Sequence, residues 1–402
     1  MRIVFLNPSG ELGGAETALL DMLAALTEAR PTWDLELIAS ADGPLLARAG
    51  ELGIRSVALK FPQPLARLGE WGGRDSAIAR VRFGAALCRA AFPAFSYASR
   101  LRRHLSAARP DIVHTNGLKM HLLGARCRPR PAKLLWHLHD YPETRAFTAA
   151  LLRAEVHHCD EVLTNSESVA SHARRLFGSA VVVQALYNSV DLQRFQPAGP
   201  KLDLDARAHL APLPAGGIRL GLVGTFARWK GHDVFLKALG RVQSATPLRA
   251  YIIGEPIYKT DASQFSMDEL RSLAARHGVA DVVGFTGRVD DVAGAMRSLD
   301  IVVHASTEPE PFGLVIAEAM ACGRPLVVSR AGGAAEIARG ALFHEPGNAA
   351  ELADRLSQLI ADPVLRASLA AEGREAAVRM FDRPRLCGTL IPIYESLAPP
   401  AD

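Results

Sequence analysis

The sequence predicts an α/β protein of two Rossmann-like parallel-sheet domains that face each other across a central cleft. The chain has 402 residues, more than one ordinary hydrophobic core takes up. Short apolar runs alternate with helical runs along nearly the whole length, which is typical of parallel sheets that helices cover on both faces. A stretch rich in proline, glycine and alanine divides the two series, so we expect domains at 1–195 and 218–378 and a linker at 196–217.

The first series of strands opens with "RIVFLN" at 2–7, an apolar run that ends in turn-forming residues. This run is too short for a signal peptide, and no uninterrupted apolar run of the chain reaches membrane-spanning length. A helix is predicted next, because Leu19, Met22 and Leu26 recur at helical spacing. The remaining strand candidates of this series are "DLELIAS", "DIVHTN", "KLLWHLH", "EVLTNS" and "VVVQALYN".

The second series supplies a further set of strand candidates, each followed by a helical run. They are "IRLGLVGTF", "LRAYIIGE", "VVGFTG", "DIVVHAS" and "PLVVSR". In parallel sheets of this kind, ligands bind beyond the carboxyl ends of the strands. Polar residues that directly follow a strand are therefore the candidates for a functional site.

The composition is that of a globular protein, with 49% apolar and 22% charged residues, and it excludes a disordered chain. Five cysteines, at positions 88, 127, 159, 322 and 387, have no metal-binding spacing and cannot all pair. We therefore expect a reduced, cytoplasmic protein.

Positive charge is concentrated in residues 60–109, which hold ten Lys or Arg residues against two acidic residues, Glu70 and Asp75. Aromatic residues lie among these cations, namely Phe83, Phe92, Phe95 and Tyr97. Such a stretch suits an anionic membrane surface, although a solvated helix face with aromatic residues in the core has the same composition. Nucleic acid is not an expected partner, because no recognition motif accompanies the charge.

Two glutamates mark the main site candidate. Glu310 follows the strand "DIVVHAS", and Glu318 lies in the first turns of the next helix. Buried carboxylates need hydrogen-bond donors, and the vicinal hydroxyls of a sugar or a ribose are paired donors. Phe312, Gly313 and Leu314 open the helix, where free backbone N–H groups can bind the oxygens of a polar ligand. The alternative is that both glutamates cap a helix end or lie in solvent.

Two cations follow the first strand of the second series. Arg228 and Lys230 lie in "VGTFARWKGHDVF", just before a predicted helix, and cations beside a helix N-terminus form a diphosphate site. An ordinary basic loop is the alternative. Another strand-to-helix loop holds Gly332, Gly333 and Glu336, where the glutamate is in position to cap the helix.

The first domain has two weaker candidates. Gly13 and Gly14 follow the first strand, and glycine lets a phosphate or a sugar approach the backbone closely. His139 follows the strand "KLLWHLH" and could bind a sugar hydroxyl or a developing charge, with His137 on the same strand face as its rival. The alternatives are an ordinary turn and a structural histidine.

These motifs resemble, in order and position, those of the retaining GT-B glycosyltransferases of family 4, also called glycosyl transferases group 1. Glu310 and Glu318 have seven residues between them, as the E-x7-E signature of that family requires. The resemblance covers nearly the whole chain. It extends through "GGAE", "HD", "TNSESVA", "YNSVDLQRF", "GTFARWKGHDVF" and "GFTGRVDDV".

The resemblance implies a role for each matching residue of the second domain. Glu310 holds hydroxyls of the sugar, together with the N–H groups of Phe312, Gly313 and Leu314. Glu318 holds the ribose.

The resemblance further implies that Lys230 binds the diphosphate, with Gly14 contacting it from the first domain. His139 contacts the transferred sugar, and Arg288 lies where the family holds the nucleobase, largely through backbone atoms. The final helix of the family crosses back to the first domain, which suits 379–402 here.

One departure from the family concerns the phosphate site. Many members have Gly-Arg where this chain has Gly224-Thr225, so a phosphate-binding arginine has to be Arg228 or is absent. The resemblance implies same-face attack with retention of configuration, in which Arg228, Lys230 and helix N-termini stabilise the leaving diphosphate. Neither a metal ion nor a cofactor is expected, and "DLD" at 203–205 lies in the expected linker, not after a strand.

The expected function is transfer of a sugar from a nucleotide-diphosphate sugar to a glycan or lipid-linked acceptor in cell-envelope polysaccharide or glycolipid biosynthesis. The location is expected to be cytoplasmic or peripheral on the inner face of the membrane. An epimerase of nucleotide sugars with the same fold is an alternative that needs additional acid–base residues. An NAD-dependent oxidoreductase lacks support, because no G-x-G-x-x-G follows either first strand. A non-catalytic carbohydrate-binding relative would not need Glu310, Glu318 and Lys230.

Overall fold

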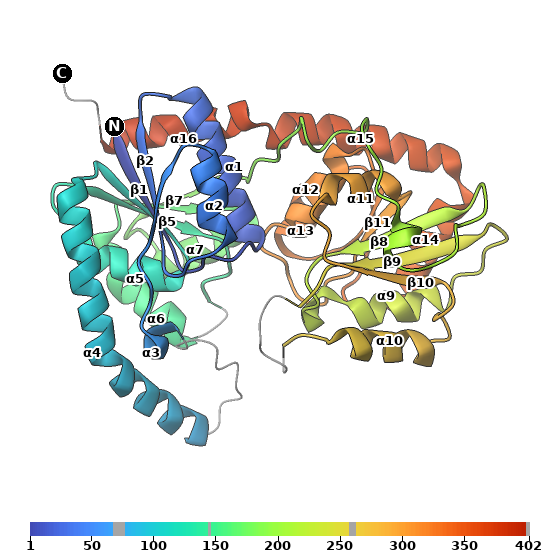
Figure 1. Cartoon of the computed structure of the whole chain (residues 1–402), viewed down its shortest axis with the longest axis horizontal. Helices are drawn as coiled ribbons and strands as arrows, with labels where there is room; N and C mark the ends of the chain where they lie inside the picture. Colours follow the sequence, from blue (N-terminus) through green and yellow to red (C-terminus); the bar gives the residue numbers. More distant parts are fainter. Residues whose placement is uncertain (67–76, 144–145, 257–262, 399–402) are drawn as a thin grey trace. The chain divides into compact units, whose positions relative to one another are not determined.

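The protein forms two compact units, each with its own parallel β-sheet (Figure 1). The first unit comprises Met1–Asn188 with Arg383–Asp402, and the second comprises Ser189–Asp382. The prediction of two parallel-sheet domains is therefore confirmed. The computed structural model describes residues 1–66, 77–143, 146–256 and 263–398, and for 66 and 77–90 it describes the backbone alone.

The sheet of the first unit has seven strands in the order β3-β2-β1-β4-β5-β6-β7, and all neighbouring strands are parallel. They are β1 (Arg2–Asn7), β2 (Asp34–Ala39), β3 (Arg55–Ala58), β4 (Ile112–Asn116), β5 (Lys133–Leu138), β6 (Glu161–Thr164) and β7 (Val182–Ala185). Side chains of β1 alternate between two cores, with Ile3 and Phe5 on one face and Val4 and Leu6 on the other. Burial on both faces explains why this strand is an uninterrupted apolar run.

Helices cover both faces of the first sheet (Figure 1). They are α1 (Gly14–Ala29), α2 (Pro44–Glu51), α3 (Gln63–Ala66), α4 (Ala77–Ala108), α5 (Leu118–Cys127), α6 (Ala146–Glu155), the short η1 (Val156–His158), α7 (Glu167–Phe177) and α16 (Arg383–Leu397). α1 and α16 pack together on one face, with Leu19 and Tyr394 buried there. On the opposite face, α4, α5 and α7 bury Leu101, Met120 and Phe177.

The second unit holds a six-stranded parallel sheet in the order β10-β9-β8-β11-β12-β13. Its strands are β8 (Ile218–Val223), β9 (Leu248–Ile253), β10 (Val283–Gly287), β11 (Ile301–His304), β12 (Leu326–Ser329) and β13 (Ala341–His344). β8 and β11 are neighbours although about 80 residues separate them in the chain. Their pairing brings the loops that follow them to the same edge of the sheet, which is where the site candidates of this domain lie.

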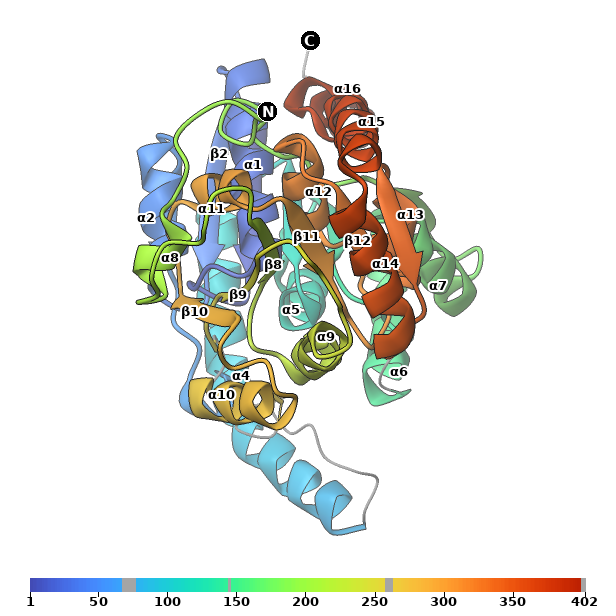
Figure 2. The ribbon, with the colours of Figure 1, turned by 90° about the vertical axis from the view of Figure 1, so that its right-hand side faces the viewer.

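Helices also cover both faces of the second sheet, and Figure 2 shows α9 and α10 on one side with α11 and α12 on the other. The helices are α8 (Leu204–Arg207), η2 (Arg228–Lys230), α9 (His232–Leu239), α10 (Met267–Arg276), α11 (Val292–Ser298), α12 (Leu314–Ala321), α13 (Gly332–Ile337), α14 (Ala349–Ala361) and α15 (Pro363–Phe381). The core beneath α9, α10 and α14 buries Phe235, Leu270 and Leu356 against the strands.

Two strands, β3 and β13, are absent from the sequence prediction. Each lies at the edge of its sheet and has four residues, most of them only partly buried. An edge strand has a neighbour on one side only, so it does not need a continuous apolar run. The signal that predicts the buried strands is therefore weak in both.

Residues 196–217 differ from the expected linker, because they belong to the second unit. Asp205 of α8 accepts hydrogen bonds from the side chains of Arg219 and Tyr251, which lie on β8 and β9. Burial opposes ionisation of Asp205, but these donors hold its pKa well below the usual range. The ionised carboxylate ties the segment to the sheet, and this is also the role that the structure gives to the "DLD" triplet.

The C-terminal segment joins the first unit at Arg383 instead of at 379, because α15 continues to Phe381 within the second unit. The Arg383 guanidinium lies 2.9 Å from carboxylate oxygens of Asp21 and Glu28, both on α1. These ion pairs mark the start of the helix that packs on the first domain.

Candidate active site

Glu310 lies after β11, in a loop that the first turn of α13 holds in place. Its backbone forms a parallel bridge with Gly332, and its carbonyl oxygen accepts a hydrogen bond from the N–H of Ala334 at 3.3 Å. The chain then turns into α12 at Gly313, which has a φ of 85°. Glycine is favoured there, because other residues rarely adopt this backbone conformation. The predicted order of strand, glutamate and helix is therefore observed.

Three donors surround the Glu310 carboxylate. The ammonium of Lys230 donates to Oε1 at 2.5 Å, while Nε2 of His304 lies 2.7 Å and Oγ of Ser306 lies 3.0 Å from Oε2. Burial alone would raise the pKa of Glu310, but the charges of Lys230 and His304 and their hydrogen bonds lower it well below its usual range. Glu310 is thus an ionised carboxylate in a buried position.

Lys230 reaches Glu310 because its loop docks on the strand that precedes the glutamate. Gly231 has a φ of 75°, and a Cβ at this position would lie 1.9 Å from the carbonyl oxygen of Ala305. The N–H of Thr307 donates to the carbonyl oxygen of Trp229 at 2.7 Å, which holds the same loop from the other side. Only glycine allows this close approach, so the "WKG" sequence is what places the lysine.

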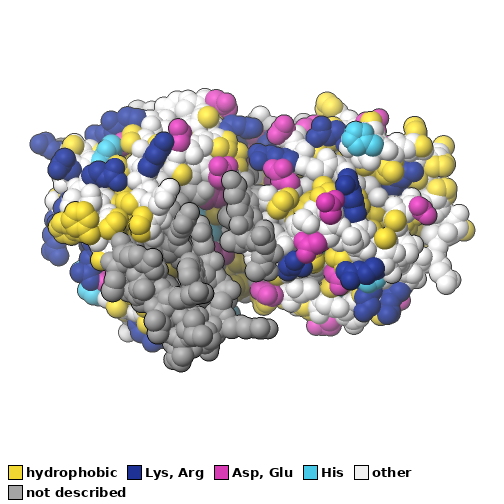
Figure 3. All heavy atoms as spheres, turned by 60° about the horizontal axis from the view of Figure 1, so that its bottom comes forward, with side chains coloured by type: hydrophobic (Ala, Val, Ile, Leu, Met, Phe, Trp, Pro, Cys, Tyr) yellow, Lys and Arg dark blue, Asp and Glu magenta, His cyan; other side chains and the backbone are white. Residues whose placement is uncertain are grey.

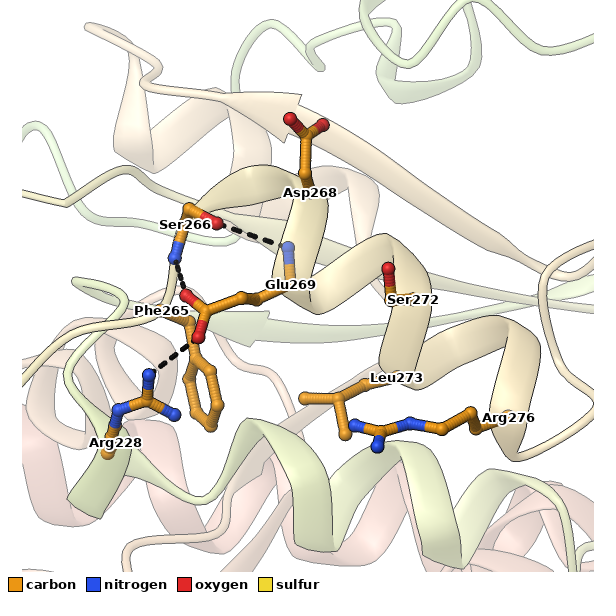
Figure 4. A pocket seen from close by; sticks show the side chains of 8 residues that line it. All are labelled: Arg228, Phe265, Ser266, Asp268, Glu269, Ser272, Leu273 and Arg276. Atoms are coloured by element: carbon orange, nitrogen blue, oxygen red, sulfur yellow. Dashed lines mark hydrogen bonds and ion pairs between the residues drawn. The ribbon is translucent and has the colours of Figure 1, made fainter. Parts of the chain in front are cut away.

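Arg228 occupies a different place from Lys230. Its guanidinium lies 2.6 Å from Oε1 of Glu269 and 4.3 Å from the ring centroid of Phe265, in a surface pocket along α10 (Figure 4). Glu269 is itself part of the capping box of α10, where it accepts from the N–H of Ser266. The structure therefore brings Lys230 to Glu310 and directs Arg228 toward α10.

The N-terminus of α12 holds the remaining predicted residues of this block. Glu318 is buried, with 8% of its surface exposed. Phe312 packs its ring edge-on against Phe381, at 5.8 Å between centroids, so its side chain belongs to the core. Gly313 is the N-cap and Leu314 the first residue of the helix, and the first-turn N–H of Ile316 donates to the carbonyl oxygen of Gly313 at 2.8 Å.

Arg288 directly follows β10, at the same edge of the sheet. Its guanidinium lies 3.4 Å from Glu255 and 3.9 Å from Asp290. Its carbonyl oxygen accepts a hydrogen bond from Arg207 at 2.8 Å. Its side chain is therefore engaged by two carboxylates at the rim of the sheet.

In the first domain, Gly13 is the N-cap of α1 and Gly14 is its first residue. The N–H of Gly13 donates to Glu16 at 3.1 Å, and the same carboxylate accepts from Asn7 at 3.1 Å. Burial raises the pKa of Glu16. A Cβ at Gly14 would meet no atom within 4 Å, so the backbone is open to close approach at this point.

The two candidate histidines of β5 have different surroundings. His137 is completely buried, and its ring lies 4.2 Å from that of His139. His139 comes just after the strand, is partly exposed, and its Nε2 lies 2.9 Å from Oδ1 of Asn116. Burial lowers the pKa of His139 to about 4, so its ring is neutral at pH 7. Of the two rivals, His139 is the one at the surface.

Comparison with known proteins assigns the chain to a family. The model of "Glycosyltransferase Family 4" matches residues 12–194, and the model of "Glycosyl transferases group 1" matches residues 217–362. Together the two matches take up most of both domains. This protein is a glycosyltransferase of family 4.

Curated relatives of this glycosyltransferase act on inositol-containing compounds, by their names. A phosphatidyl-myo-inositol mannosyltransferase of Mycobacterium leprae is 29% identical over 311 residues, which are 75% of this chain and 77% of that protein. A D-inositol 3-phosphate glycosyltransferase of an Arthrobacter species is 37% identical over 198 residues, 47% of this chain and 44% of that protein.

Solved structures of similar proteins share the whole fold. HepE of Anabaena, crystallised with UDP-glucose, covers 98% of this chain and 100% of its own at 26% identity, with a TM-score of 0.78. A sucrose-phosphate synthase of Thermosynechococcus elongatus has a TM-score of 0.76 at 20% identity, with 99% of each chain covered. Both matches agree with the two-domain GT-B architecture predicted from the motif order.

Two residues next to Glu310 were not singled out by the sequence reasoning for this glycosyltransferase. His304 and Ser306 both contact its carboxylate, and the His304 side chain is only 3% exposed. A signal exists in "DIVVHAS", because a histidine inside a buried apolar strand needs a polar partner. The glutamate six positions later is that partner.

The described part of the chain lacks two other kinds of site. No group of three or more His, Cys, Asp or Glu residues there could hold a metal ion. None of the helices described is long and apolar enough to cross a bilayer.

The basic and aromatic segment 60–109 includes the long helix α4. Phe92 and Phe95 on this helix are 80% and 71% exposed, whereas Tyr97 is buried in the core. Hydrophobic and basic side chains lie together on the left of the face in Figure 3. Phe83, which belongs to the same predicted surface, lies outside the described side chains.

Proposed function

We propose that this glycosyltransferase moves a sugar from a nucleotide-diphosphate sugar to a glycan or lipid-linked acceptor, with retention of anomeric configuration. The observation that carries the proposal is the ionised Glu310 beside Lys230, at the sheet edge where two strand loops meet. A buried carboxylate and an ammonium 2.5 Å apart suit a ligand with both hydroxyls and phosphates. UDP-glucose in the HepE crystals and the inositol-related names of the curated relatives support a nucleotide-sugar donor and a glycolipid pathway.

In the proposed complex, Glu310 binds sugar hydroxyls together with the N–H groups of Phe312, Gly313 and Leu314. Glu318, buried on the same helix, binds the ribose. We propose that Arg288, after β10, lies beside the nucleobase. The N-terminus of α12 favours the ligand oxygens electrostatically, because its N–H groups carry partial positive charge.

Lys230 is the proposed cation for the diphosphate. Its charge lowers the pKa of Glu310, which keeps the carboxylate ionised despite burial. A diphosphate carries more negative charge than one carboxylate and competes for the ammonium. Arg228 would have to leave Glu269 to reach the same phosphates, so we propose a secondary role for it.

The chemistry follows from the charges that develop when the bond between sugar and diphosphate breaks. Negative charge grows on the leaving diphosphate, and Lys230, with Gly14 from the first domain, is proposed to stabilise it. We propose that His139, neutral at pH 7, contacts the transferred sugar. A phosphate oxygen takes the proton of the acceptor hydroxyl during same-face attack. The lysine and the helix N–H groups supply the positive charge, so the proposal includes neither a metal ion nor a cofactor.

We also propose that the protein is cytoplasmic and binds peripherally to an anionic membrane through segment 60–109. Exposed Phe92 and Phe95 support this, because aromatic side chains on a basic helix insert at the lipid interface while the cations meet the headgroups. A lipid-linked acceptor would be met at the same surface.

The test is a thermal-shift screen against UDP, GDP, ADP, CMP, dTDP and NAD. A rise of the apparent melting temperature with one nucleoside diphosphate is expected, since a ligand of the native state stabilises it. The matching nucleotide sugar is then incubated with candidate inositol-containing acceptors, and the anomeric proton of the product is read by NMR. An inverted product would contradict retention, and a shift with NAD alone would contradict the donor assignment.

An epimerase of nucleotide sugars is the second candidate, favoured only by the shared fold. It predicts that the nucleotide sugar is converted to its epimer without any acceptor. The same NMR experiment without acceptor separates the two functions.

A further inference from the structure

A buried polar cluster lies against one oxygen of the Glu310 carboxylate. Nε2 of His304 is 2.7 Å and Oγ of Ser306 is 3.0 Å from Oε2, and these two groups are 3.0 Å from each other. Both side chains belong to the end of β11 or the residues just after it. The contacts of Oε2 are therefore made with buried side chains.

The His304 ring is held at both of its nitrogens. Nδ1 lies 3.2 Å from Oγ of Ser329, at the end of the neighbouring strand β12. The parallel pairing of β11 with β12 sets His304 opposite Val328, which brings Ser329 to the ring. Rotation of the ring would break the contact on both sides, so its orientation is defined by two strands.

The other carboxylate oxygen has different surroundings. Oε1 is contacted by Lys230, the last residue of the short helix η2. The side chain of Lys230 is 18% exposed, compared with 3% for the side chain of His304. A long, mobile ammonium can change partners more readily than a buried ring between two strands. Oε1 is thus the oxygen at which a ligand can replace a protein group.

We propose that His304 is a positioning residue, which anchors Glu310 through Oε2 and so presents Oε1 to the hydroxyls of the donor sugar. This inference rests on the proposed function of Glu310. It predicts that His304 contributes to recognition of the sugar and not of the nucleotide, because its contact reaches the ligand only through Glu310.

The experiment compares two substitutions that separate the two ring nitrogens. In His304→Gln the amide nitrogen takes approximately the place of Nε2, so the contact with Glu310 is kept. In His304→Asn the shorter amide takes the place of Nδ1, which keeps Ser329 and loses Glu310. His104→Asn is the matched control, because Nε2 of His104 also lies 2.7 Å from a buried carboxylate, that of Glu36 in the first domain.

Dissociation constants are measured by calorimetry for UDP, UDP-glucose, GDP and GDP-mannose, and kcat and KM for the donor that binds. His304→Asn is expected to weaken binding of the nucleotide sugar by about 10- to 100-fold relative to the free nucleotide, as expected for loss of a charged hydrogen bond. His304→Gln should keep most of the wild-type preference for the nucleotide sugar over the free nucleotide. His104→Asn should leave it unchanged.

The outcomes separate the inference from the function on which it rests. If the wild type prefers the nucleotide sugar and His304→Asn keeps that preference, the positioning role is wrong while the proposed function stands. If Asn and Gln variants lose affinity for nucleotide and sugar nucleotide equally, His304 has a general structural role and the inference is also overturned. A folded wild type that binds neither these four ligands nor any other nucleotide of the thermal-shift screen would overturn the proposed function and the inference together.

A second measurement does not depend on any ligand. Unfolding free energies of His304→Asn, Glu310→Gln and the double variant form a mutant cycle, which reports the coupling of the two side chains. Coupled effects are expected, with the double variant less destabilised than the sum of the singles. Additive effects would contradict the anchoring contact.

Discussion

At the scale of single residues, the environment of Glu310 explains how a carboxylate can be buried in this fold. Lys230, His304 and Ser306 donate hydrogen bonds to its carboxylate, and these contacts offset the cost of burying the charge. Removing one partner of such a set leaves the others desolvated and unpaired. Substitutions here should therefore affect both catalysis and stability.

We expect Glu310→Ala to lower kcat by about 100-fold or more, because a group that is proposed to contact the transferred sugar is lost. The variant should remain folded but melt at a lower temperature, since Lys230 and His304 lose their partner. Glu310→Gln should melt closer to the wild type, because its amide oxygen still accepts hydrogen bonds. Steady-state kinetics and a melting curve check both points. A fully active, folded Glu310→Ala protein would contradict the site assignment.

The neighbouring cations are expected to differ in their effects. Lys230→Ala should cost about 100-fold in kcat/KM, as a group proposed to stabilise the leaving diphosphate. Arg228→Ala should reduce the rate less, since its guanidinium is engaged by Glu269 and Phe265. Kinetics of both variants on the same donor decide the order. A larger loss for Arg228→Ala would show that this arginine leaves α10 to bind phosphate.

At the scale of elements, the loop after β8 positions the lysine by packing against the residues after β11. Gly231 is the closest point of that contact. Gly278 offers a comparison in the same domain, because it has a similar φ of 69° but a Cβ there would meet no atom within 4 Å. The two glycines separate backbone strain from a steric clash.

Gly278→Ala should cost about 1–2 kcal/mol of unfolding free energy, the usual price of a left-handed non-glycine residue. Gly231→Ala should cost more and also lower activity, because the clash with Ala305 displaces the loop that carries Lys230. Denaturant unfolding and kinetics measure the two effects. Equal losses of stability with unchanged activity in both variants would argue against a docked loop.

Three histidines in and beside the first sheet should make the stability of the protein depend on pH. Burial lowers the pKa of His114 to about 3 and that of His139 to about 4, and it also lowers the pKa of His137 well below its ordinary value. Since the ordinary value is about 6.5, the unfolded chain binds more protons than the folded one below that pH. Stability is therefore complete above about pH 6.5 and is lost as the pH falls toward 4.

We expect His137→Leu to weaken this acid sensitivity, by up to ~1.4 kcal/mol per pH unit below pH 6.5. Among the described residues neither of its ring nitrogens has a hydrogen-bond partner, so the apolar side chain should be tolerated at pH 7. Urea unfolding at pH 7, 6 and 5 provides the slopes. A variant with the slope of the wild type would show that His137 takes up its proton in the folded state.

At the scale of the whole molecule, the question is whether the protein meets a membrane. Phe92 and Phe95 lie exposed on α4, a position that costs solubility unless a partner covers them. The same helix continues with three cationic residues, Arg100, Arg102 and Arg103. The combination favours a surface that is both apolar and negatively charged.

Flotation with vesicles of phosphatidylcholine and phosphatidylglycerol tests this surface. The wild type is expected to float with anionic vesicles at low salt and to be released as the salt concentration rises. The double variant Phe92→Ser, Phe95→Ser should float less, whereas Phe147→Ser, which removes an exposed aromatic residue elsewhere, should behave as the wild type. If the wild type does not float, α4 presents a solvated helix face and not a membrane-binding surface.

The sequence by itself determined the central strands, the strand-to-helix loops and the places of Glu310, Glu318 and Lys230 in them. These features follow from apolar periodicity and short spacings, which are local properties of the chain. The edge strands β3 and β13 escaped prediction, because a strand with one neighbour needs little apolar surface. The attachment of residues 196–217 to the second unit was missed for a related reason, since the ion pairs of Asp205 are made with strands that are distant in the sequence.

Only the tertiary structure decided which groups meet. Lys230 and Glu310 are 80 positions apart and come together because β8 lies beside β11, whereas Arg228, two residues away, turns to Glu269. The sequence indicates that His304 needs a polar partner, and the structure shows that this partner is Glu310. Strand order is set by long-range packing, and no spacing in the sequence encodes it directly. The residue types of the site were thus readable from the chain, and their pairing was decided by the fold.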